Sequence, residues 1–425
     1  MKTQELERFF ISSRLEEMRK GRAYYAGRND ILDRERTIII RKTRLDLKHL
    51  SNNKIAHPFL RTLVDQKIGY LLALPFSVHA DDEVLAERLG TFFDKAFLRQ
   101  LKAIGRDAVV CGAGWMAVYY DEGGQIRTRR IAPETVAPVY DTQDIDRITG
   151  AVRKYEQDGI RFYEWWTTDG VRTFMDDAGE LRPLSERGHF SLGETQFNWA
   201  RLPLIQFRYN ADARPLITFV KPLVDDYDER VSDVANLLED TPNNLKIVRG
   251  YQDDPETFVR NLATLNCVFL QEGGDVSNLE SKVDVDTHEA HLNRLRKDIF
   301  HAGRGVDTQE TAAGELSGTA IRYRYSELDL DCKNMGAEFA EALEELVWFI
   351  CEDMRMKGEG EHAPKIDIVW NTDHIINELQ TVQILAASKG LISDATIIEN
   401  HPYVTDPEAE KQRLAEEMQA ENAEY

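Results

Sequence analysis

The sequence predicts an α+β fold, and two features of the chain carry that prediction. Large apolar residues recur at steps of three and four from Ile321 to Ile350, which is the spacing of one buried helix face. Short aromatic and β-branched segments separated by Gly- and Asp-containing turns fill about residues 115 to 210. With 425 residues, 42% of them apolar and 30% charged, the chain suits a soluble globular protein of two or three structural regions.

The apolar stripe predicts one long helix over residues 318–357. No proline interrupts it, and at 1.5 Å a residue the rod from Ile321 to Met356 is about 52 Å long. Its opposite face is charged, through Glu327, Asp329, Asp331, Glu338, Glu341, Glu345 and Glu352. The small polar residues 307–318 just before it predict a mobile loop. On this stretch alone, a surface loop and a core helix are the simpler interpretation.

Helices are expected to dominate the N-terminal part of the chain. Residues 31–57 read as a basic, irregular segment, and Pro58 stands at the first turn of a helix. The helices are predicted over about residues 3–20, 59–72, 82–99 and 99–111. An antiparallel β-region follows, with strands at 115–120, 127–131, 136–140, 148–156, 161–167, 171–175 and 201–210.

The second half of the chain returns to helices. An acidic helix is predicted from Pro222, near its first turn, to Pro242. A more basic helix is predicted over 288–303, with Arg294, Arg296, Lys297 and Arg304. Between them lie a strand at 245–249, a helix at 255–262 and a strand at 267–271. After the long helix come a strand at 365–370, a helix at 374–389, a short helix capped by Ser393, and a polar helix from Asp406.

The formal net charge of −21 argues against a sequence-specific DNA-binding protein with a broad basic face. Four cysteines lie far apart with no metal-ligand spacing, so reduced thiols in an intracellular protein are expected. The first ten residues lack the pattern of a signal peptide. The longest apolar stretch, near residues 68–78, is too short to span a bilayer and contains Pro75, so no membrane partner is expected.

Motifs for catalysis are weak throughout. Neither a phosphate-binding G-x-x-x-x-G-K-[ST] loop nor a G-x-S-x-G nucleophile elbow occurs. His288 and His291 share a helix face but have no third ligand placed by the sequence, which favours an exposed pair over a metal site. Asp225, Asp226 and Asp228 point to different sides of a helix, which favours a solvated face. We therefore expect no enzyme activity, no catalytic residues, no metal and no cofactor.

Several segments together resemble the portal, or head–tail connector, proteins of tailed bacteriophages, in the branch typical of long non-contractile tails. The resemblance covers about residues 20–355 and lies in the order and spacing of the whole set. Its residues are Tyr24-Tyr25-x-Gly27-x-x-Asp30-Ile31, Asn53-Lys54-Ile55-Ala56-x-x-Phe59-x-Arg61-x-Leu63-Val64-Asp65-Gln66-Lys67-x-Gly69-Tyr70-Leu71-Leu72-x-x-Pro75, Lys221-Pro222-Leu223-Val224-Asp225-x-Tyr227-Asp228, Ser232-x-x-x-Asn236-x-Leu238-Glu239-Asp240, Gly273-Gly274-Asp275-Val276, Leu295-x-Lys297-Asp298-Ile299 and Ser317-Gly318-x-Ala320-Ile321-x-x-Arg324-Tyr325.

The resemblance implies a portal fold and a ring, usually dodecameric, at one vertex of the virion capsid, assembled in the host cytoplasm. Double-stranded DNA would be packaged through the ring by a terminase, without sequence specificity, and later ejected. Scaffolding protein, major capsid protein and a head-completion adaptor would be further partners. The implied parts are a wing (1–220), stem helices (221–241 and 287–304), a clip (242–286), a tunnel loop (305–318), a long helix with a return strand (319–371) and a helical crown (372–425).

The resemblance also implies site residues. Arg294, Arg296, Lys297 and Arg304 would face the DNA channel, and Lys246, Arg249 and Tyr251 would face the motor and adaptor in the clip. The tunnel loop would be Gln309, Glu310, Thr311, Ala312, Ala313, Gly314, Glu315 and Leu316, which is acidic and would meet DNA by shape rather than by charge. Two alternatives remain open at this point: a metal-dependent nuclease, and a cytoplasmic scaffold or adaptor without a channel.

Overall fold

The computed structural model describes the chain in two compact units. The first unit comprises Met1–Arg19, Leu63–Pro215 and Arg304–Tyr425, and the second comprises Lys20–Thr62 and Leu216–Gly303. The described residues are 3–415 without 13, 41–42, 47–50, 145–146, 241–244, 250–255, 257–272, 280–284, 310–317, 372–377, 400, 402–403, 405–406 and 408–409.

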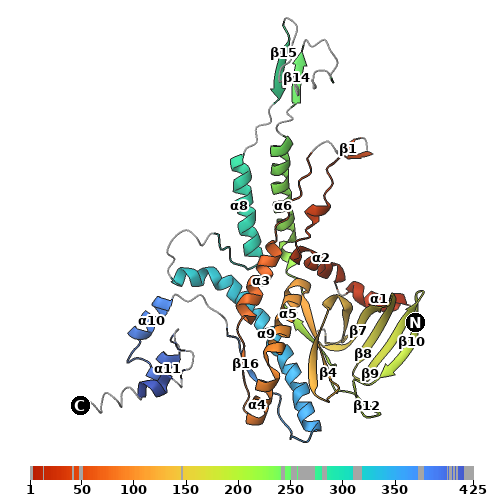
Figure 1. The fold of residues 1–425 in the computed structure, drawn as a ribbon, viewed down its shortest axis with the longest axis vertical. Coiled ribbons are helices and arrows are strands. Elements are labelled where there is room, and N and C mark those ends of the chain that lie inside the picture. The colour runs from red at the N-terminus through yellow and green to blue at the C-terminus, as the bar shows by residue number, and fades with distance from the viewer. Residues whose placement is uncertain are drawn as a thin grey trace. The chain divides into compact units, whose positions relative to one another are not determined.

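Two antiparallel sheets form the β-region of the first unit (Figure 1). The five-stranded sheet has the order β10-β9-β8-β7-β6, and the three-stranded sheet has the order β13-β4-β5. The strands are β4 (Ala113–Tyr120), β5 (Ile126–Ile131), β6 (Val136–Tyr140), β7 (Ile148–Gln157), β8 (Ile160–Thr167), β9 (Gly170–Asp177), β10 (Glu180–Arg187) and β13 (Leu204–Arg208). The antiparallel β-region predicted from the sequence is confirmed. Strand β10 and the hairpin β11 (Phe190–Leu192)–β12 (Thr195–Phe197) were not predicted.

The five-stranded sheet is covered on both faces. One face packs on the three-stranded sheet through a core that includes Trp115, Ile131 and Trp166. The other face packs on α1 (Thr3–Ser12), whose Leu6 and Phe10 are buried against the sheet. Side chains alternate between the faces of a strand, so neighbouring residues on β8 serve the two different cores.

The long helix predicted over 318–357 is confirmed as α9 (Gly318–Met356), whose 39 residues span roughly 58 Å. Seven residues of the apolar stripe are buried: Leu328, Cys332, Met335, Phe339, Leu343, Leu346 and Ile350. The interior glycine Gly336 has a packing role, because its carbonyl oxygen accepts a hydrogen bond from the Trp370 indole at 3.1 Å. A side chain at this position would meet the same indole at 3.0 Å.

Several predicted boundaries were wrong. The helix expected over 3–20 is two helices, α1 and α2 (Leu15–Tyr25), and α2 continues through Gly21. The helices expected at 82–99 and 99–111 are α4 (Glu83–Phe92) and α5 (Lys95–Cys111). They are separated where the Asp94 carboxylate accepts a hydrogen bond from the Phe97 amide and caps α5.

The remaining elements of the first unit include α3 (Phe59–Leu72), which crosses the boundary between the units. Strand β16 (Asp367–Val369) pairs with β3 (Ser77–His79). The C-terminal helices are α10 (Glu378–Ala387) and α11 (Asp394–Glu399), and Ser393 caps α11 as predicted. The helix predicted from Asp406 lies largely outside the described residues.

The second unit contains a pair of antiparallel helices, α6 (Ile217–Asp240) and α8 (Val285–Ala302), connected through the hairpin β14 (Leu245–Arg249)–β15 (Asp275–Leu279) (Figure 1). Helix α6 begins five residues before Pro222, so that proline lies inside the helix. The unit also holds the short helix η1 (Asp30–Asp33) and the hairpin β1 (Thr37–Ile40)–β2 (Thr43–Asp46), within the segment predicted to be irregular. The helix expected at 255–262 and the strand expected at 267–271 lie outside the described residues, apart from Glu256.

Three cysteines of the described part, Cys111, Cys332 and Cys351, are buried and form no disulfide with one another. Across the described residues, none of the helices is both long enough and apolar enough to cross a lipid bilayer.

Candidate functional site

The basic residues of α8 lie on two different sides of the helix. Leu295, Ile299 and Phe300 are buried and define its packed face. At 100° a residue, Arg294 and Lys297 fall opposite that face, in the stripe Ala290, Arg294, Lys297 and His301 with steps of four, three and four. The Arg294 side chain is 80% exposed, and its guanidinium lies 3.7 Å from Asp298. Among the described residues of α6 and α8, this is the only helix face that carries several basic side chains at helical spacing.

Arg296 and Arg304 do not belong to that stripe. The Arg296 guanidinium lies over the Phe300 ring, 5.6 Å from its centroid, and the side chain is half-buried. Arg304 lies two residues beyond the end of α8, in the first unit. Its guanidinium is 3.4 Å from Asp331 of α9, and its backbone has a φ of 47°. The four predicted channel residues are therefore distributed over three environments.

The three aspartates of α6 have separate structural partners. Asp225 accepts hydrogen bonds from the Tyr24 hydroxyl and from Lys221, at 2.5 Å for the lysine. Asp226 lies 3.0 Å from the Arg230 Nε atom and 3.2 Å from the imidazole of His291. Asp225 and Asp226 therefore point in different directions, as the sequence predicted.

Asp228 contradicts the prediction of a solvated face, because it is completely buried. Its carboxylate accepts hydrogen bonds from the Asn29 side chain at 2.6 Å and the His57 backbone amide at 2.9 Å, and lies 2.8 Å from the His57 imidazole. Since a buried carboxylate must be paired, Asp228 fixes the segment around His57 onto α6. Among the described residues, no group of three or more His, Cys, Asp or Glu side chains is placed to hold a metal ion.

The clip residues are only partly described. Lys246 stands opposite Asn278 and Arg249 opposite Asp275 in the β14–β15 register, and Arg249 is exposed. The predicted Tyr251 lies outside the described residues. The hairpin itself is an antiparallel pair of five residues a strand.

The root of the predicted tunnel loop is held by α3. The Gln66 side chain exchanges two hydrogen bonds with the Val306 backbone, at 2.7 and 3.0 Å. The buried Lys67 ammonium donates to the Arg304 carbonyl oxygen at 3.1 Å and to Asp331 Oδ2 at 2.7 Å. Of the predicted loop residues, Gln309 is described and exposed, and Glu310–Leu316 lie outside the described residues.

The sequence placed Asp331 on the charged face of the long helix, and this junction was not predicted from it. Asp331 is 12% exposed and also accepts a hydrogen bond from Tyr209 at 2.6 Å. One signal was available: Lys67 stands between Val64 and Leu71 on the apolar face of α3, where a lysine requires a buried carboxylate partner.

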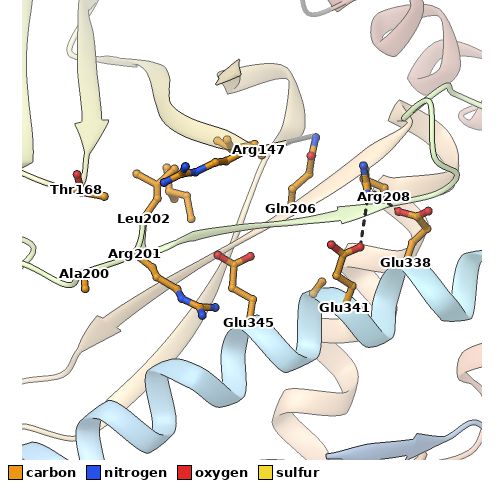
Figure 2. Close-up of a pocket in the computed structure, with 13 residues that line it drawn as sticks. Arg147, Thr168, Ala200, Arg201, Leu202, Gln206, Arg208, Glu338, Glu341 and Glu345 are labelled. Atoms are coloured by element: carbon orange, nitrogen blue, oxygen red, sulfur yellow. Dashed lines mark hydrogen bonds and ion pairs between the residues drawn. The ribbon is translucent and has the colours of Figure 1, made fainter. Parts of the chain in front are cut away.

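A pocket of about 340 Å³ lies between α9 and β13 in the first unit (Figure 2). Glu338 and Glu341 on α9 pair with Arg208 of β13, at 2.7 and 3.3 Å. Glu345, one turn further along α9, has no hydrogen bond or ion pair to a described residue. Burial raises the pKa of Glu345 to about 7, which the nearby Arg201 partly offsets. The acidic face of α9 is therefore unevenly buried here, since Glu338 is 18% exposed and Glu341 is 75% exposed.

Comparison with known proteins places nearly the whole chain in one family. A family described as "Phage portal protein, SPP1 Gp6-like" matches residues 11–424. The chain is 27% identical to the portal protein of Bacillus phage SPP1, over 95% of this chain and 84% of that protein. It is 24% identical to the portal protein of Clostridium phage phiCD119, over 95% and 93%. A chain from the neck of a native GTA particle, computed with C12 symmetry, gives a TM-score of 0.48 at 14% identity, covering 80% of this chain and 88% of that one.

The family match sets aside both alternatives that the sequence left open, the nuclease and the scaffold without a channel. A portal is a structural, non-enzymatic protein of the phage head, where it assembles as an oligomeric ring at the capsid vertex. This chain belongs to the SPP1-like family of phage portal proteins.

Proposed function

We propose that this portal forms a dodecameric ring around an axial channel through which double-stranded DNA is packaged and later ejected. A terminase motor drives the DNA inward, and a head-completion adaptor docks once packaging ends. Scaffolding and major capsid proteins hold the ring at its vertex, and assembly takes place in the host cytoplasm. Family membership supports this account.

We assign the parts of the chain to this function as follows. Helices α6 and α8 form the stem, and β14 and β15 belong to the clip that meets the motor and the adaptor. The β-region and the helices packed on it form the wing, and residues 372–425 form the crown. Residues 305–318 form the tunnel loop. We expect deletion of residues 309–316 to spare ring assembly and to impair DNA packaging or retention.

The observation that carries the channel assignment is the exposed stripe of Arg294 and Lys297 on the face of α8 opposite its packed residues. A channel must not hold DNA tightly, because each phosphate contact adds affinity. A protein of net charge −21 with a few cations along one stem helix meets that requirement. Arg296 and Arg304 stay in the assignment as flanking residues, because neither belongs to the exposed stripe: Arg296 lies over Phe300 and Arg304 lies against Asp331.

Packaging assays on procapsids test this assignment. The double variant Arg294→Gln/Lys297→Gln is expected to form rings normally and to change the rate or the salt dependence of DNA packaging. Arg172→Gln is the matched control, because Arg172 is an exposed arginine of β9 that pairs with Glu186. Packaging by the double variant that equals wild type at every salt concentration would contradict the assignment.

A further inference from the structure

A cluster of arginines lies at the rim of the interface between the two sheets of the first unit. Arg129 of β5, Arg153 of β7 and Arg187 of β10 surround Glu164 of β8, and we call these three residues the arginine cluster. Glu164 is only 8% exposed, and its carboxylate lies 3.0 Å from Arg153 and 3.5 Å from Arg187. The cluster thus joins both sheets and is centred on one nearly buried carboxylate.

The charges of this group do not balance. Three guanidiniums face a single carboxylate, and Glu164 also accepts a hydrogen bond from the Trp166 indole at 3.1 Å. The Arg129 guanidinium has neither a hydrogen bond nor an ion pair to a described residue. The Nε atom of Arg153 is buried without a hydrogen-bond partner. Burial lowers the pKa of Arg129, and the neighbouring Arg153 lowers it further. The three guanidiniums therefore carry two positive charges more than Glu164 neutralises.

Aromatic rings hold the guanidiniums in place. Arg129 lies over Tyr119 at 5.4 Å, Arg153 over Tyr155 at 4.9 Å and Arg187 over Trp166 at 5.5 Å from the ring centroids. Stacking on a ring leaves the edge of a guanidinium free to form two parallel hydrogen bonds with a carboxylate. The site is therefore preorganised for a second planar anion beside Glu164.

We propose that the arginine cluster binds a carboxylate side chain of a second copy of this chain in the ring. A ring places a neighbouring copy against each subunit through a heterologous contact, in which different surfaces meet. The chain carries 74 acidic against 53 basic residues, so a second copy offers carboxylates that complement the excess of two positive charges in the cluster. The contact would then be an inter-subunit ion pair of the wing.

Substitution of Arg129 tests the proposal, because that side chain supports no described hydrogen bond or ion pair within its own subunit. The control is Arg172→Glu. Arg172 is paired in register with Trp165, which packs on the α1 side of the same sheet, so Arg172 lies on the opposite face from the cluster. Rings are counted by electron microscopy and native mass spectrometry over a series of NaCl concentrations. The samples are ones in which the wild type forms rings, alone or in procapsids. Far-UV circular dichroism verifies folding, and Arg129→Gln is used should Arg129→Glu not fold.

We expect Arg129→Glu to lower the fraction of subunits in rings by about tenfold or more, and Arg172→Glu to leave it unchanged. Amide hydrogen exchange in β5 and β7 should be slower in wild-type rings than in free subunits. Normal ring formation by folded Arg129→Glu or Arg129→Gln would overturn the proposal. Rings that form normally but retain less DNA would overturn it too, because the bound anion would then be a phosphate.

Discussion

The Lys67 ammonium of α3 lies 2.7 Å from the Asp331 carboxylate of α9, and both side chains are removed from solvent. This pair joins residues 264 positions apart in the chain, and the same ammonium also holds the Arg304 carbonyl oxygen. One buried cation thus fixes the long helix and the root of the predicted tunnel loop to the same point.

Removing the cation should strongly destabilise the first unit. Lys67→Met leaves the Asp331 carboxylate buried with less compensation, and we expect a loss of about 3 kcal/mol in the free energy of unfolding. Lys333→Met is the control, because Lys333 is 68% exposed and its pair with Asp329 should contribute about 0.5 kcal/mol or less. Urea unfolding of the two variants and the wild type measures the difference. Equal losses of unfolding free energy in the two variants would show that the buried Lys67–Asp331 pair contributes no more than the exposed Lys333–Asp329 pair.

The second unit has its own buried carboxylate. Asp228→Ala removes one of the two acceptors of the Asn29 side-chain amide, which keeps its 3.0 Å hydrogen bond to the His57 carbonyl oxygen. It also removes the acceptor of the His57 backbone amide. We expect a cost of about 2–4 kcal/mol, against less than about 0.5 kcal/mol for Glu229→Ala, an exposed neighbour on α6. Hydrogen exchange of the amides near His57 and in α6 should accelerate in the first variant only. Unchanged exchange in Asp228→Ala would contradict this account.

The raised pKa of Glu345 makes part of the stability dependent on pH. The carboxyl group titrates near 4.5 when the chain is unfolded and near 7 when it is folded, so the folded state binds more protons between these values. Its stabilising contribution is complete below pH 4.5 and is lost as the pH rises through 7.

Glu345→Gln should therefore gain stability relative to wild type as the pH rises from 5 to 8, by roughly 1–3 kcal/mol. Glu344→Gln, at the exposed neighbouring position, should show the pH dependence of the wild type. Thermal unfolding at pH 5, 6, 7 and 8 provides the comparison. A constant difference between Glu345→Gln and wild type across this range would refute the assignment.

Position 336 tests the packing of the long helix. Gly336→Leu would force a side chain against the Trp370 indole, which lies 3.0 Å from where a Cβ atom would be placed. We expect a loss of about 1–3 kcal/mol and a red-shifted tryptophan fluorescence, because the indole must leave its site. Leu330→Ala, at an exposed position of the same helix, should change neither property by more than a small amount. An unshifted emission spectrum would count against this packing role.

The sequence was informative where the interactions are local. The apolar period from Leu328 to Ile350 predicted the long helix and its buried face, and the turn signals predicted most of the β-region. Helix boundaries were harder to predict from the sequence. The start of α5 after Asp94, rather than at residue 99, depends on one hydrogen bond to the Asp94 side chain. A break was expected at Gly21, but α2 continues through it, because packing outweighs the low helix propensity of one glycine.

The sites were less predictable, because they depend on distant pairs. Helical spacing correctly predicted that Asp225, Asp226 and Asp228 point in different directions. It could not show that Asp228 is buried against Asn29, 199 residues away in the chain. The arginine cluster draws its members from three strands, and their positions in the chain give no sign that they meet. The family resemblance supplied the function, which the charge pattern alone did not.

The most direct test of the central claim is electron cryomicroscopy of the assembled ring. The account predicts closed rotational symmetry around a central opening wide enough for duplex DNA, with Arg294 and Lys297 of every α8 helix directed toward the axis. A ring without an axial opening would contradict the channel, and so would a stripe of Arg294 and Lys297 on the outer surface of the stem.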